Sequence, residues 1–352
     1  MTQQDEPGQD EPGQDAPPGV DLARLTSWLD EQAPGLRQGS LSAQLITGGR
    51  SNLTYRLSDD HQHWALRRPP LGHVLPTAHD MAREFKVISA LHGSQVPVPK
   101  PVALCQDPDV LGEPFYLMSF VEGVVIERPE LVPDQTTATR ITEQLVDTLV
   151  ALHGIAANDI GLADFGRPDG YLQRQVARWH RQFQASVPAG HQQEQQVVGA
   201  LQAEIPTGGR AGIVHGDYRL TNVLFDRQLT GIEAVVDWEM ATLGDPLTDL
   251  GLLYVYHERA AGTDTVMPNF PSEQGFLSPQ RMIARYAERA GQQLAELDWY
   301  IAFGYFKLGV IAAGIHARYL QGLTVGAGFE VFGTLRDSTL AAAAARLNEA
   351  GV

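Results

Sequence analysis

The stretch that decides the fold of this chain spans residues 215–249 and reads HGDYRLTNVLFDRQLTGIEAVVDWEMATLGDPLTD. Three of its side chains carry oxygen atoms that can hold a hydroxyl group or a divalent cation, namely Asp217, Asn222 and Asp237. Short apolar runs flank them at residues 212–214, 223–225 and 232–236. Such runs predict short strands that bring the three polar side chains to one place.

The residue types in this stretch are typical of a phosphoryl-transfer site. Phosphoryl transfer depends mainly on positioning the reacting groups and on neutralising charge with magnesium, which carboxylate and carboxamide oxygens can hold. The chain contains no Gly-Lys dipeptide, so a Walker A phosphate loop is excluded. The stretch therefore indicates kinase chemistry without a P-loop.

Length and composition favour a two-lobed globular enzyme. The chain has 352 residues, more than the about 100 to 200 of a typical domain, so we expect two lobes that share one cleft. Hydrophobic residues make up 43% of the sequence, as in a soluble globular protein. No membrane span is expected, because the longest apolar stretches, such as residues 301–314, are interrupted by Lys307 and fall short of the roughly 20 residues that cross a bilayer.

Charge and cysteine content narrow the partners and the compartment. The formal net charge of -16 argues against nucleic-acid binding, which requires clustered Lys and Arg. Residues 1–20 contain the acidic repeat QDEPG twice and are expected to form a disordered tail. The only cysteine, Cys105, cannot form an intramolecular disulfide, and no signal peptide opens the chain. The cytoplasm is therefore the expected compartment.

The N-terminal half predicts an antiparallel sheet that follows a helix starting near Asp21. Strands are expected at residues 41–46, 54–57 and 64–66. The turn between the first two contains Gly49, Ser51 and Asn52, where bare backbone amides could approach a nucleotide phosphate. The alternative is a plain hairpin turn without a ligand.

A cation and a carboxylate in the same region predict an ion pair. Arg67 ends the third strand, and Glu84 lies on a helix predicted over residues 81–91. Such a pair would aim the arginine at phosphates, although two unrelated surface charges are the alternative. Farther on, residues 115–121 predict a buried strand that crosses between the lobes, and backbone groups from Ser119 to Val121 could bind an adenine edge.

The C-terminal half is predicted to be helical. Apolar periodicity marks residues 141–152, 171–184, 282–289, 299–320 and 331–347. Arg174 and Arg178 lie four residues apart and either contact an anionic substrate or are solvated. Asp245 before Pro246 predicts a helix N-cap, so Asp245 and Asp249 are expected to be structural.

Three further features either have no predicted catalytic role or leave their role open. Asp164, Phe165 and Gly166 spell DFG but precede His215, so we expect a turn there. The clustered histidines at positions 61, 63, 73 and 79 lack zinc-ligand spacing. The loop over residues 262–279 is either a lid or a connector.

The spacing of His215-Gly216-Asp217, Asn222 and Asp237 resembles the catalytic core of the aminoglycoside phosphotransferase family of kinase-like small-molecule kinases. The resemblance covers most of the chain from about residue 41 onward. The phrases that carry it further are GGRSNLTYRL, WALRRPP, AHDMAREFKVISAL, VPVP, PFYLMSFVEG and HGDYRLTNVLFD. They are similar to the subgroup that also occurs as the N-terminal domain of acyl-CoA dehydrogenase family members 10 and 11.

The resemblance implies an α+β, protein-kinase-like bilobal fold. It places a nucleotide-binding lobe with an antiparallel sheet over residues 21–121 and a larger, mostly helical catalytic and substrate-binding lobe over residues 122–352. Two departures stand out: Arg67 occupies the strand position where most kinases have lysine, and Thr221 lies where relatives often have an acidic residue. The arginine could alter nucleotide affinity or choice, because it is larger and differently hydrated.

The resemblance also implies a role for each site residue. Asp217 would orient and deprotonate the acceptor hydroxyl, and Arg219 would stabilise charge on the transferred group. Asn222 and Asp237 would hold Mg²⁺ ions that bridge the phosphates of ATP or GTP. The nucleotide would be bound by Gly49, Ser51, Asn52, Arg67, Glu84, Ser119 and Val121.

We therefore predict transfer of the γ-phosphoryl group of ATP or GTP to a hydroxyl group of a small molecule. The subgroup implies a hydroxyacyl or hydroxyacyl-CoA acceptor, and the broader family an aminoglycoside or an amino alcohol. The rival from another class is a nucleotide-binding pseudoenzyme or regulatory module, against which the intact Asp217, Asn222 and Asp237 argue. Protein-kinase activity is disfavoured because no APE-like motif follows Asp237.

Overall fold

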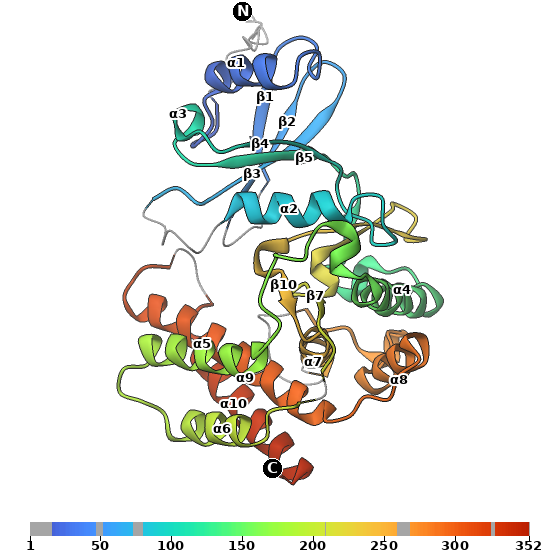
Figure 1. Ribbon diagram of the computed structural model, residues 1–352, viewed down its shortest axis with the longest axis vertical. Helices are drawn as coiled ribbons and strands as arrows, with labels where there is room; N and C mark the ends of the chain where they lie inside the picture. Colours follow the sequence, from blue (N-terminus) through green and yellow to red (C-terminus); the bar gives the residue numbers. More distant parts are fainter. Residues whose placement is uncertain are drawn as a thin grey trace, which may run out of the picture. The chain divides into compact units, whose positions relative to one another are not determined.

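The computed structural model describes residues 16–46, 52–72, 80–207, 209–258, 268–324 and 328–351. Of the predicted site residues, Gly49 and Ser51 lie outside this part of the chain, as do the histidines at positions 73 and 79 and residues 262–267 of the open loop. The described chain forms two compact units. The first comprises the described residues up to Phe85 and Lys100–Phe120, and the second comprises Lys86–Pro99 and the described residues from Val121 onward (Figure 1).

A five-stranded antiparallel sheet forms the first unit, with the strand order β1-β2-β3-β5-β4. The strands are β1 (Ser42–Leu45), β2 (Leu53–Ser58), β3 (His63–Arg68), β4 (Pro101–Cys105) and β5 (Phe115–Ser119). Alternation along β3 places Leu66 in the core and Arg67 on the other face. The predicted antiparallel sheet is confirmed, and β4 is a strand that the sequence did not predict.

Helix α1 (Leu22–Gln32) covers one face of this sheet (Figure 1). It begins at Leu22 because the Asp21 side chain accepts a hydrogen bond from the Arg24 amide at 3.0 Å. Leu25 and Leu29 of α1 are buried in one cluster with the apolar side chains of β2, β3 and β5. The short helix α3 (Pro108–Leu111) packs beside α1, and α2 (Met81–Leu91) carries Glu84.

The end of the predicted tail is in contact with the first unit. The Tyr55 hydroxyl donates a hydrogen bond to the Pro18 carbonyl at 2.6 Å, and Val20 is buried. The prediction of disorder up to residue 20 was therefore too long for these last residues. The backbone carbonyls and one aliphatic side chain supply contacts that the polar composition of the tail did not indicate.

Short strands in the second unit position the catalytic stretch, residues 215–249. Strand β7 (Gly212–Val214) pairs with β10 (Thr242–Gly244), and β8 (Val223–Phe225) lies between β6 (Val124–Val125) and β9 (Ile232–Val235). The pairing of Val223 with Val235 brings Asn222 beside the residues that follow β9. The Val236 amide accordingly donates to the Asn222 carbonyl at 3.0 Å.

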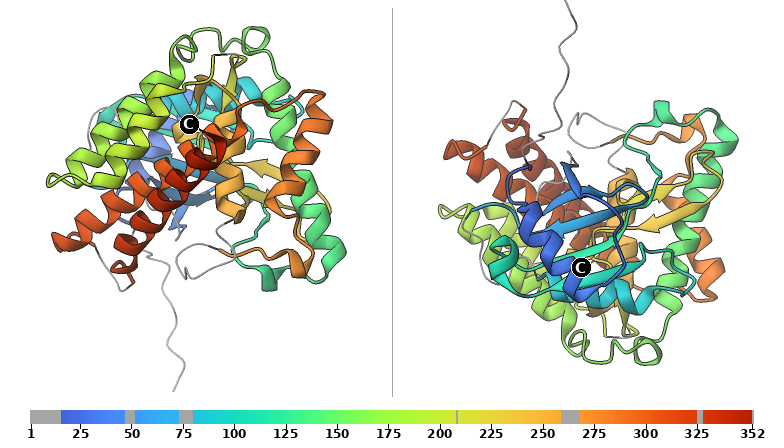
Figure 2. Two further views of the ribbon diagram at one scale, coloured as in Figure 1. Left: turned by 90° about the horizontal axis from the view of Figure 1, so that it is seen from below. Right: turned by 90° about the horizontal axis from the view of Figure 1, so that it is seen from above.

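Seven α-helices build the rest of the described second unit. They are α4 (Gln135–Gly154), α5 (Tyr171–Ser186), α6 (Gln192–Ala203), α7 (Leu247–Glu258), α8 (Pro279–Ala290), α9 (Leu297–Leu320) and α10 (Val331–Ala350). Single 3-10 turns occupy Pro129–Leu131, Ala157–Ile160, Leu220–Asn222, Trp238–Met240 and Ser272–Gln274. α4 and α8 lie side by side, whereas α5, α6, α9 and α10 form a separate group, and α7 contacts both α8 and α9 (Figures 1 and 2).

Helix α9 forms much of the core of this second unit. By length and composition it could cross a membrane, yet 72% of its most apolar window is buried inside the unit. Its large side chains, such as Trp299 and Phe306, belong to one buried cluster with Val176 and Trp179 of α5 and Leu340 of α10. This burial is typical of the central helix of a globular protein.

The DFG turn is confirmed by the structure. Residues 163–164 lie in a turn, and Asp164 is exposed and pairs with Lys86 at 2.6 Å. This carboxylate is thus part of a surface ion pair.

Candidate active site

His215 connects the segment that carries Asp217 to the segment that carries Asp237. Its ring is fully buried and packs against Trp238, with ring centroids 4.6 Å apart. The His215 Nε2–H donates to the Val236 carbonyl at 3.0 Å, so Nδ1 is the acceptor that receives the Asp217 amide at 3.2 Å. One neutral imidazole therefore fixes the backbone on both sides of the site.

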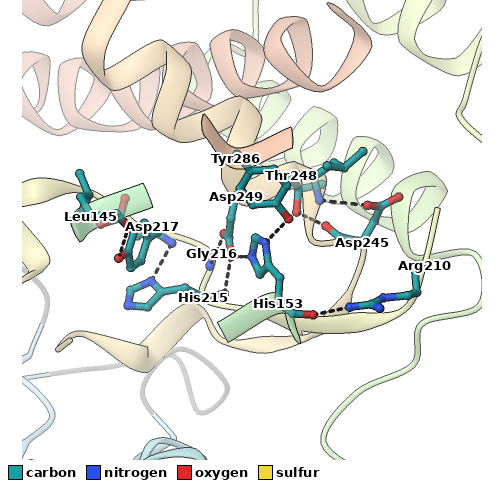
Figure 3. Close-up of polar contacts among 12 residues, drawn as sticks. Leu145, His153, Arg210, His215, Gly216, Asp217, Asp245, Thr248, Asp249 and Tyr286 are labelled. Carbon is teal, nitrogen blue, oxygen red and sulfur yellow. Dashed lines mark hydrogen bonds and ion pairs between the residues drawn. The ribbon is translucent and has the colours of Figure 1, made fainter. Parts of the chain in front are cut away.

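Asp249, near the start of α7, anchors the same segment through its carboxylate (Figure 3). Its two carboxylate oxygens accept the backbone amides of His215 at 2.7 Å and Gly216 at 2.8 Å. His153 lies 3.3 Å from the same carboxylate and also contacts Tyr286. Burial alone would raise the pKa of Asp249, but the hydrogen bond from His153 and the neighbouring donors hold it below its usual range.

Asp245 and Asp249, the acids that follow the Asp217 motif, have structural contacts, as the sequence predicted. The Asp245 carboxylate accepts the Leu247 amide at 3.0 Å, which caps the start of α7, and it also receives the Tyr300 hydroxyl at 2.6 Å. Burial raises the pKa of Asp245. Asp245 and Asp249 thus hold backbone and helix in place, as the N-cap pattern predicted.

Gly216 is required where the chain turns toward Asp217. Its φ of +86° is in the left-handed region. A Cβ at this position would lie 2.7 Å from the Met240 Cβ and 2.8 Å from the Met240 carbonyl oxygen. Any other residue would both strain the turn and collide with the segment after Asp237.

The side chain of Asp217 lies at the centre of a cluster of hydrogen-bond donors. The Asn222 amide donates to the Asp217 carbonyl at 2.8 Å and to Oδ2 at 3.0 Å. The Tyr256 hydroxyl, on α7, donates to Oδ1 at 2.5 Å. These contacts hold the carboxylate in one orientation, and 19% of the side chain is exposed.

Two cations approach Asp217 from opposite parts of the unit. The Arg219 Nε lies 3.4 Å from Asp217 Oδ2, and its guanidinium carbon lies 5.4 Å from the ring centroid of Tyr256. Burial would lower the pKa of Arg219, but the charges of Asp217 and Asp237 outweigh it and raise that pKa. The buried Lys307 of α9 donates to the Gly216 carbonyl, and burial lowers its pKa although Asp217 and Asp249 oppose the shift.

Asn222 and Asp237 have the donor chemistry that magnesium prefers. Because both hydrogen bonds of the Asn222 side chain are given by its nitrogen to Asp217, its amide oxygen is turned away from that residue. Asp237 follows β9 with a φ of +68°, a conformation that costs a non-glycine residue energy and often marks a functional position. The oxygens of these two side chains are ligands of the kind that Mg²⁺ takes together with water and phosphate.

The described residues contain no cluster of three or more His, Cys, Asp or Glu that could hold a metal alone. This is compatible with a magnesium site that is completed by a phosphate ligand. Of the clustered histidines, His63 is half-buried on β3, and its ring contacts the Ser58 hydroxyl at 2.8 Å.

The predicted ion pair of the first unit is present. The Arg67 Nε donates to Glu84 Oε2 at 2.8 Å, and Glu84 is only 2% exposed. The Tyr116 hydroxyl and the Asn52 amide also donate to Glu84, at 3.0 and 2.9 Å. Arg67 and Tyr116 are register partners on β3 and β5, which places both on the face that meets α2. The Asn52 side chain therefore supports the ion pair, and its part in nucleotide binding stays a prediction.

One of the backbone amides predicted to bind adenine is already hydrogen-bonded within the sheet. The Ser119 amide donates to the Lys100 carbonyl at 2.8 Å, so this N–H is not available to a ligand. In the described part of the chain, the Val121 amide makes no backbone hydrogen bond. Val121 is thus the better placed of the two to donate to a base.

The two arginines of α5 differ in their contacts. Arg174 donates to the carbonyls of Asp169 and Arg167 and thus fixes the loop before its own helix. Arg178 is exposed, and its guanidinium carbon lies 5.8 Å from the Trp179 ring centroid. Burial lowers the pKa of Lys307 most, and the charge of Arg178 lowers it further. Only Arg178 is therefore placed to act on an anion near Lys307.

A pocket adjoins Asp217 on the side of Arg219 and Tyr256. It is a small, half-open hollow of about 20 Å³ that is also lined by Leu220, Thr221, His257, Pro268 and Phe270. His257 is buried, and its Nδ1–H donates to the Leu253 carbonyl at 3.1 Å. In the neutral ring, Nε2 then carries no hydrogen and is an acceptor. Burial lowers the pKa of His257 to about 4, which keeps the ring neutral.

Sequence reasoning missed Tyr256, Lys307 and His257. Tyr256 lies 39 residues after Asp217, and Lys307 lies 91 residues after Gly216, so no motif spacing connects them to the site. A signal existed for Lys307: a single cation inside an otherwise apolar helix is almost never buried without a partner. No comparable signal marked the tyrosine or the histidine.

Comparison with known proteins places this geometry among phosphotransferases. Residues 42–300 match the phosphotransferase enzyme family. The human protein "Acyl-CoA dehydrogenase family member 11" is 33% identical over 312 residues, which is 86% of this chain and 40% of that protein. The chain thus spans about 40% of the length of this curated relative.

Solved structures agree with the fold. A crystal structure from Ralstonia eutropha JMP134, described as a candidate aminoglycoside phosphotransferase, has a TM-score of 0.82 at 30% identity and covers 94% of this chain and 98% of its own. The GDP complex of aminoglycoside 2'-phosphotransferase-IIIa has a TM-score of 0.60 at 15% identity and covers 92% and 99%. The predicted α+β, protein-kinase-like fold is therefore confirmed.

Proposed function

The chain belongs to the phosphotransferase enzyme family, and on that premise we propose that it transfers the γ-phosphoryl group of ATP or GTP to a hydroxyl group of a small molecule. One observation carries this proposal: Asp217, Asn222 and Asp237 come together at the ends of β7, β8 and β9. A base for the hydroxyl and oxygen ligands for magnesium are the parts that phosphoryl transfer requires.

Asp217 acts on the acceptor in the proposed reaction. Its carboxylate accepts a hydrogen bond from the acceptor hydroxyl and takes the proton as the hydroxyl oxygen forms a bond to the γ-phosphorus. The bond from that phosphorus to the bridging oxygen breaks, and the nucleoside diphosphate leaves. His215 and Asp249 keep the carboxylate in place through the Asp217 and Gly216 amides.

Asn222 and Asp237 would hold Mg²⁺. Bound there, the ion would neutralise the charge of the nucleotide phosphates. The cations of the chain complement this role: Arg219 lies against Asp217, and Arg67 is aimed by Glu84 in the first unit. Both would interact with phosphate oxygens, for which arginine offers two parallel donors.

The pocket beside Asp217 favours an acceptor whose hydroxyl sits on an apolar carbon chain. Leu220, Pro268 and Phe270 provide apolar walls, and Arg219 supplies a positive charge. An aminoglycoside or amino alcohol would bring a positive charge toward the guanidinium of Arg219. A hydroxyacyl compound, free or bound to coenzyme A, is therefore our first candidate, and the cationic alcohols are the second.

A nucleotide-binding pseudoenzyme is the rival proposal, and one pair of measurements separates the two. First, the melting temperature is measured with ATP and with GTP, with and without Mg²⁺, because a ligand that binds the folded state raises it. Second, label transfer from γ-³²P nucleotide is screened against 3-hydroxybutyryl-CoA, kanamycin and ethanolamine. Magnesium-dependent stabilisation with transfer supports the enzyme, and stabilisation without any transfer supports the pseudoenzyme. Absence of stabilisation by either nucleotide contradicts both.

A further inference from the structure

We propose that Tyr256 guards the base Asp217. Its phenol occupies the position that the acceptor hydroxyl takes on the Asp217 carboxylate until an acceptor displaces it. It thereby prevents Asp217 from activating water for attack on the γ-phosphorus. This inference rests on the function proposed above. It assigns Tyr256 as the residue that discriminates the alcohol acceptor from water.

The geometry of Tyr256 is that of a bound acceptor. A hydroxyl that gives its proton to a base must lie within hydrogen-bond reach of it. The Tyr256 oxygen lies 2.5 Å from Asp217 Oδ1 and points its hydrogen at that oxygen. The other carboxylate oxygen, Oδ2, is already shared by Asn222 and Arg219. Within the described residues, Tyr256 is therefore the sole hydroxyl partner of Asp217.

The phenol is held in its protonated form. Burial raises the pKa of Tyr256 well above its ordinary value, and the charge of Asp217 raises it further. At neutral pH the hydroxyl can thus donate to Asp217 but does not become a nucleophilic phenolate. The guanidinium of Arg219 lies against the ring, with its carbon 5.4 Å from the centroid. Tyr256 consequently caps the base without being a reactive acceptor itself.

Unsatisfied atoms next to Tyr256 indicate that the arrangement changes when a ligand binds. Two buried polar atoms of the pocket lining have no hydrogen-bond partner in the described part of the chain: Thr221 Oγ1 and His257 Nε2. Such atoms are rare in folded proteins, because leaving them unpaired is costly. Both can form hydrogen bonds with the polar groups of an acceptor. Entry of a molecule with polar groups would supply these partners and push the phenol aside.

This arrangement distinguishes an alcohol from water by size. In the unwanted reaction, a water oxygen would bond to the γ-phosphorus, its proton would pass to Asp217, and the nucleoside diphosphate would leave. A water molecule has no body to fill the pocket, so it gains little by displacing the phenol from Oδ1. An acceptor gains the apolar contacts of Pro268 and Phe270 and the partners of Thr221 and His257.

The test compares Tyr256→Phe with the wild type in ATP and Mg²⁺ without any acceptor. We expect the release of ADP and inorganic phosphate to rise roughly tenfold or more in the variant, because one hydrogen bond to a charged group is lost from the guard. Tyr256→Leu, which also lacks the phenol, should show the same rise and serves if the first variant folds poorly. The matched control is Tyr254→Phe on the same helix, whose hydroxyl contacts Glu258 at 2.7 Å, and it should hydrolyse ATP at the wild-type rate.

A second readout separates guarding from mere positioning. With whichever of 3-hydroxybutyryl-CoA, kanamycin and ethanolamine the wild type phosphorylates, the ratio of ATP hydrolysis to transfer should rise in Tyr256→Phe. A fall in kcat with no rise in hydrolysis would overturn the guard and assign Tyr256 to orienting Asp217. Wild-type transfer with unchanged hydrolysis in both variants would sink this inference alone, whereas a wild type that neither bound AMP-PNP nor transferred phosphate would also sink the proposed function.

Discussion

The ammonium group of Lys307 donates a hydrogen bond to the carbonyl oxygen of Gly216, the residue that precedes Asp217. Lys307 is 7% exposed, and its Nζ also lies 5.3 Å from the ring centroid of Trp179. A buried ammonium is costly unless it is paired. Its place beneath the turn connects the core helix α9 to the proposed base.

Replacing Lys307 by methionine should reduce catalysis more than stability. The variant keeps the apolar volume but loses the charge and the hydrogen bond that hold the Gly216 carbonyl, so we expect kcat to fall roughly tenfold to a hundredfold. The melting temperature should change little, because removing a buried charge also removes its desolvation cost. Lys86→Met, which removes an exposed lysine paired with Asp164, is the charge-matched control and should keep wild-type kcat. Equal kcat in all three proteins would show that Lys307 only fills the core.

Gly216→Ala should destabilise the fold at the catalytic turn. The new methyl group would meet Met240 at under 3 Å in a backbone conformation with φ of +86°. Gly93→Ala is a matched control, because Gly93 has φ of +84° but nothing within 4 Å of the added Cβ. Urea denaturation should show a loss for Gly93→Ala of about 1 to 2 kcal/mol from strain alone and a clearly larger loss for Gly216→Ala. Equal losses would mean that the segment after Asp237 can move away.

Asp249→Ala should cost much more stability than a surface acid does. It would leave the His215 and Gly216 amides without their acceptor in a site that is 1% exposed, so the free energy of unfolding should fall by about 3 to 5 kcal/mol. Asp164→Ala removes an exposed ion pair and should cost at most about 1 kcal/mol. Chemical denaturation of the two variants tests this, and similar small losses would remove Asp249 from its anchoring role.

His257 should make the protein sensitive to mild acid. Its pKa falls from the ordinary 6.5 to about 4 in the folded state, so between these values the unfolded chain binds a proton that the folded chain does not. The free energy of unfolding should therefore decrease as pH falls from about 6.5 to about 4, with a contribution on the order of 3 kcal/mol. His257→Gln should flatten the pH dependence in this window, and an unchanged slope would show that other groups cause the acid sensitivity.

The sequence identified the parts of the fold that follow a simple period. Alternation predicted β2 and β3, and helical spacing predicted α2 with its bounds, so the Arg67–Glu84 pair could be foreseen from a strand end and the next helix. Strand β4 was missed because it follows a run of alternating prolines that reads as an extended link. Helix α6 was missed because its polar, glutamine-rich sequence shows little apolar periodicity.

The site was predicted only where its residues are close in sequence. Asn222 and Asp237 flank the β8–β9 hairpin, and Asp217 lies five residues before Asn222, so their spacing indicates that they meet. Tyr256 and Lys307 reach the same place from α7 and α9 through tertiary packing, which a single sequence does not encode as spacing. The arrangement of donors around the base had to come from the structure.

The central claim is phosphoryl transfer to an alcohol with Asp217 as the base, and its most direct test is label transfer from γ-³²P ATP by the wild type and Asp217→Asn side by side. Mixtures contain Mg²⁺ and 3-hydroxybutyryl-CoA, kanamycin or ethanolamine. We predict that the wild type labels at least one of these alcohols and that Asp217→Asn, while still stabilised by AMP-PNP and Mg²⁺, transfers on the order of 10² to 10⁴ times more slowly. Equal transfer by the two proteins would contradict the assignment of the base, and a wild type that labels no alcohol would contradict the account as a whole.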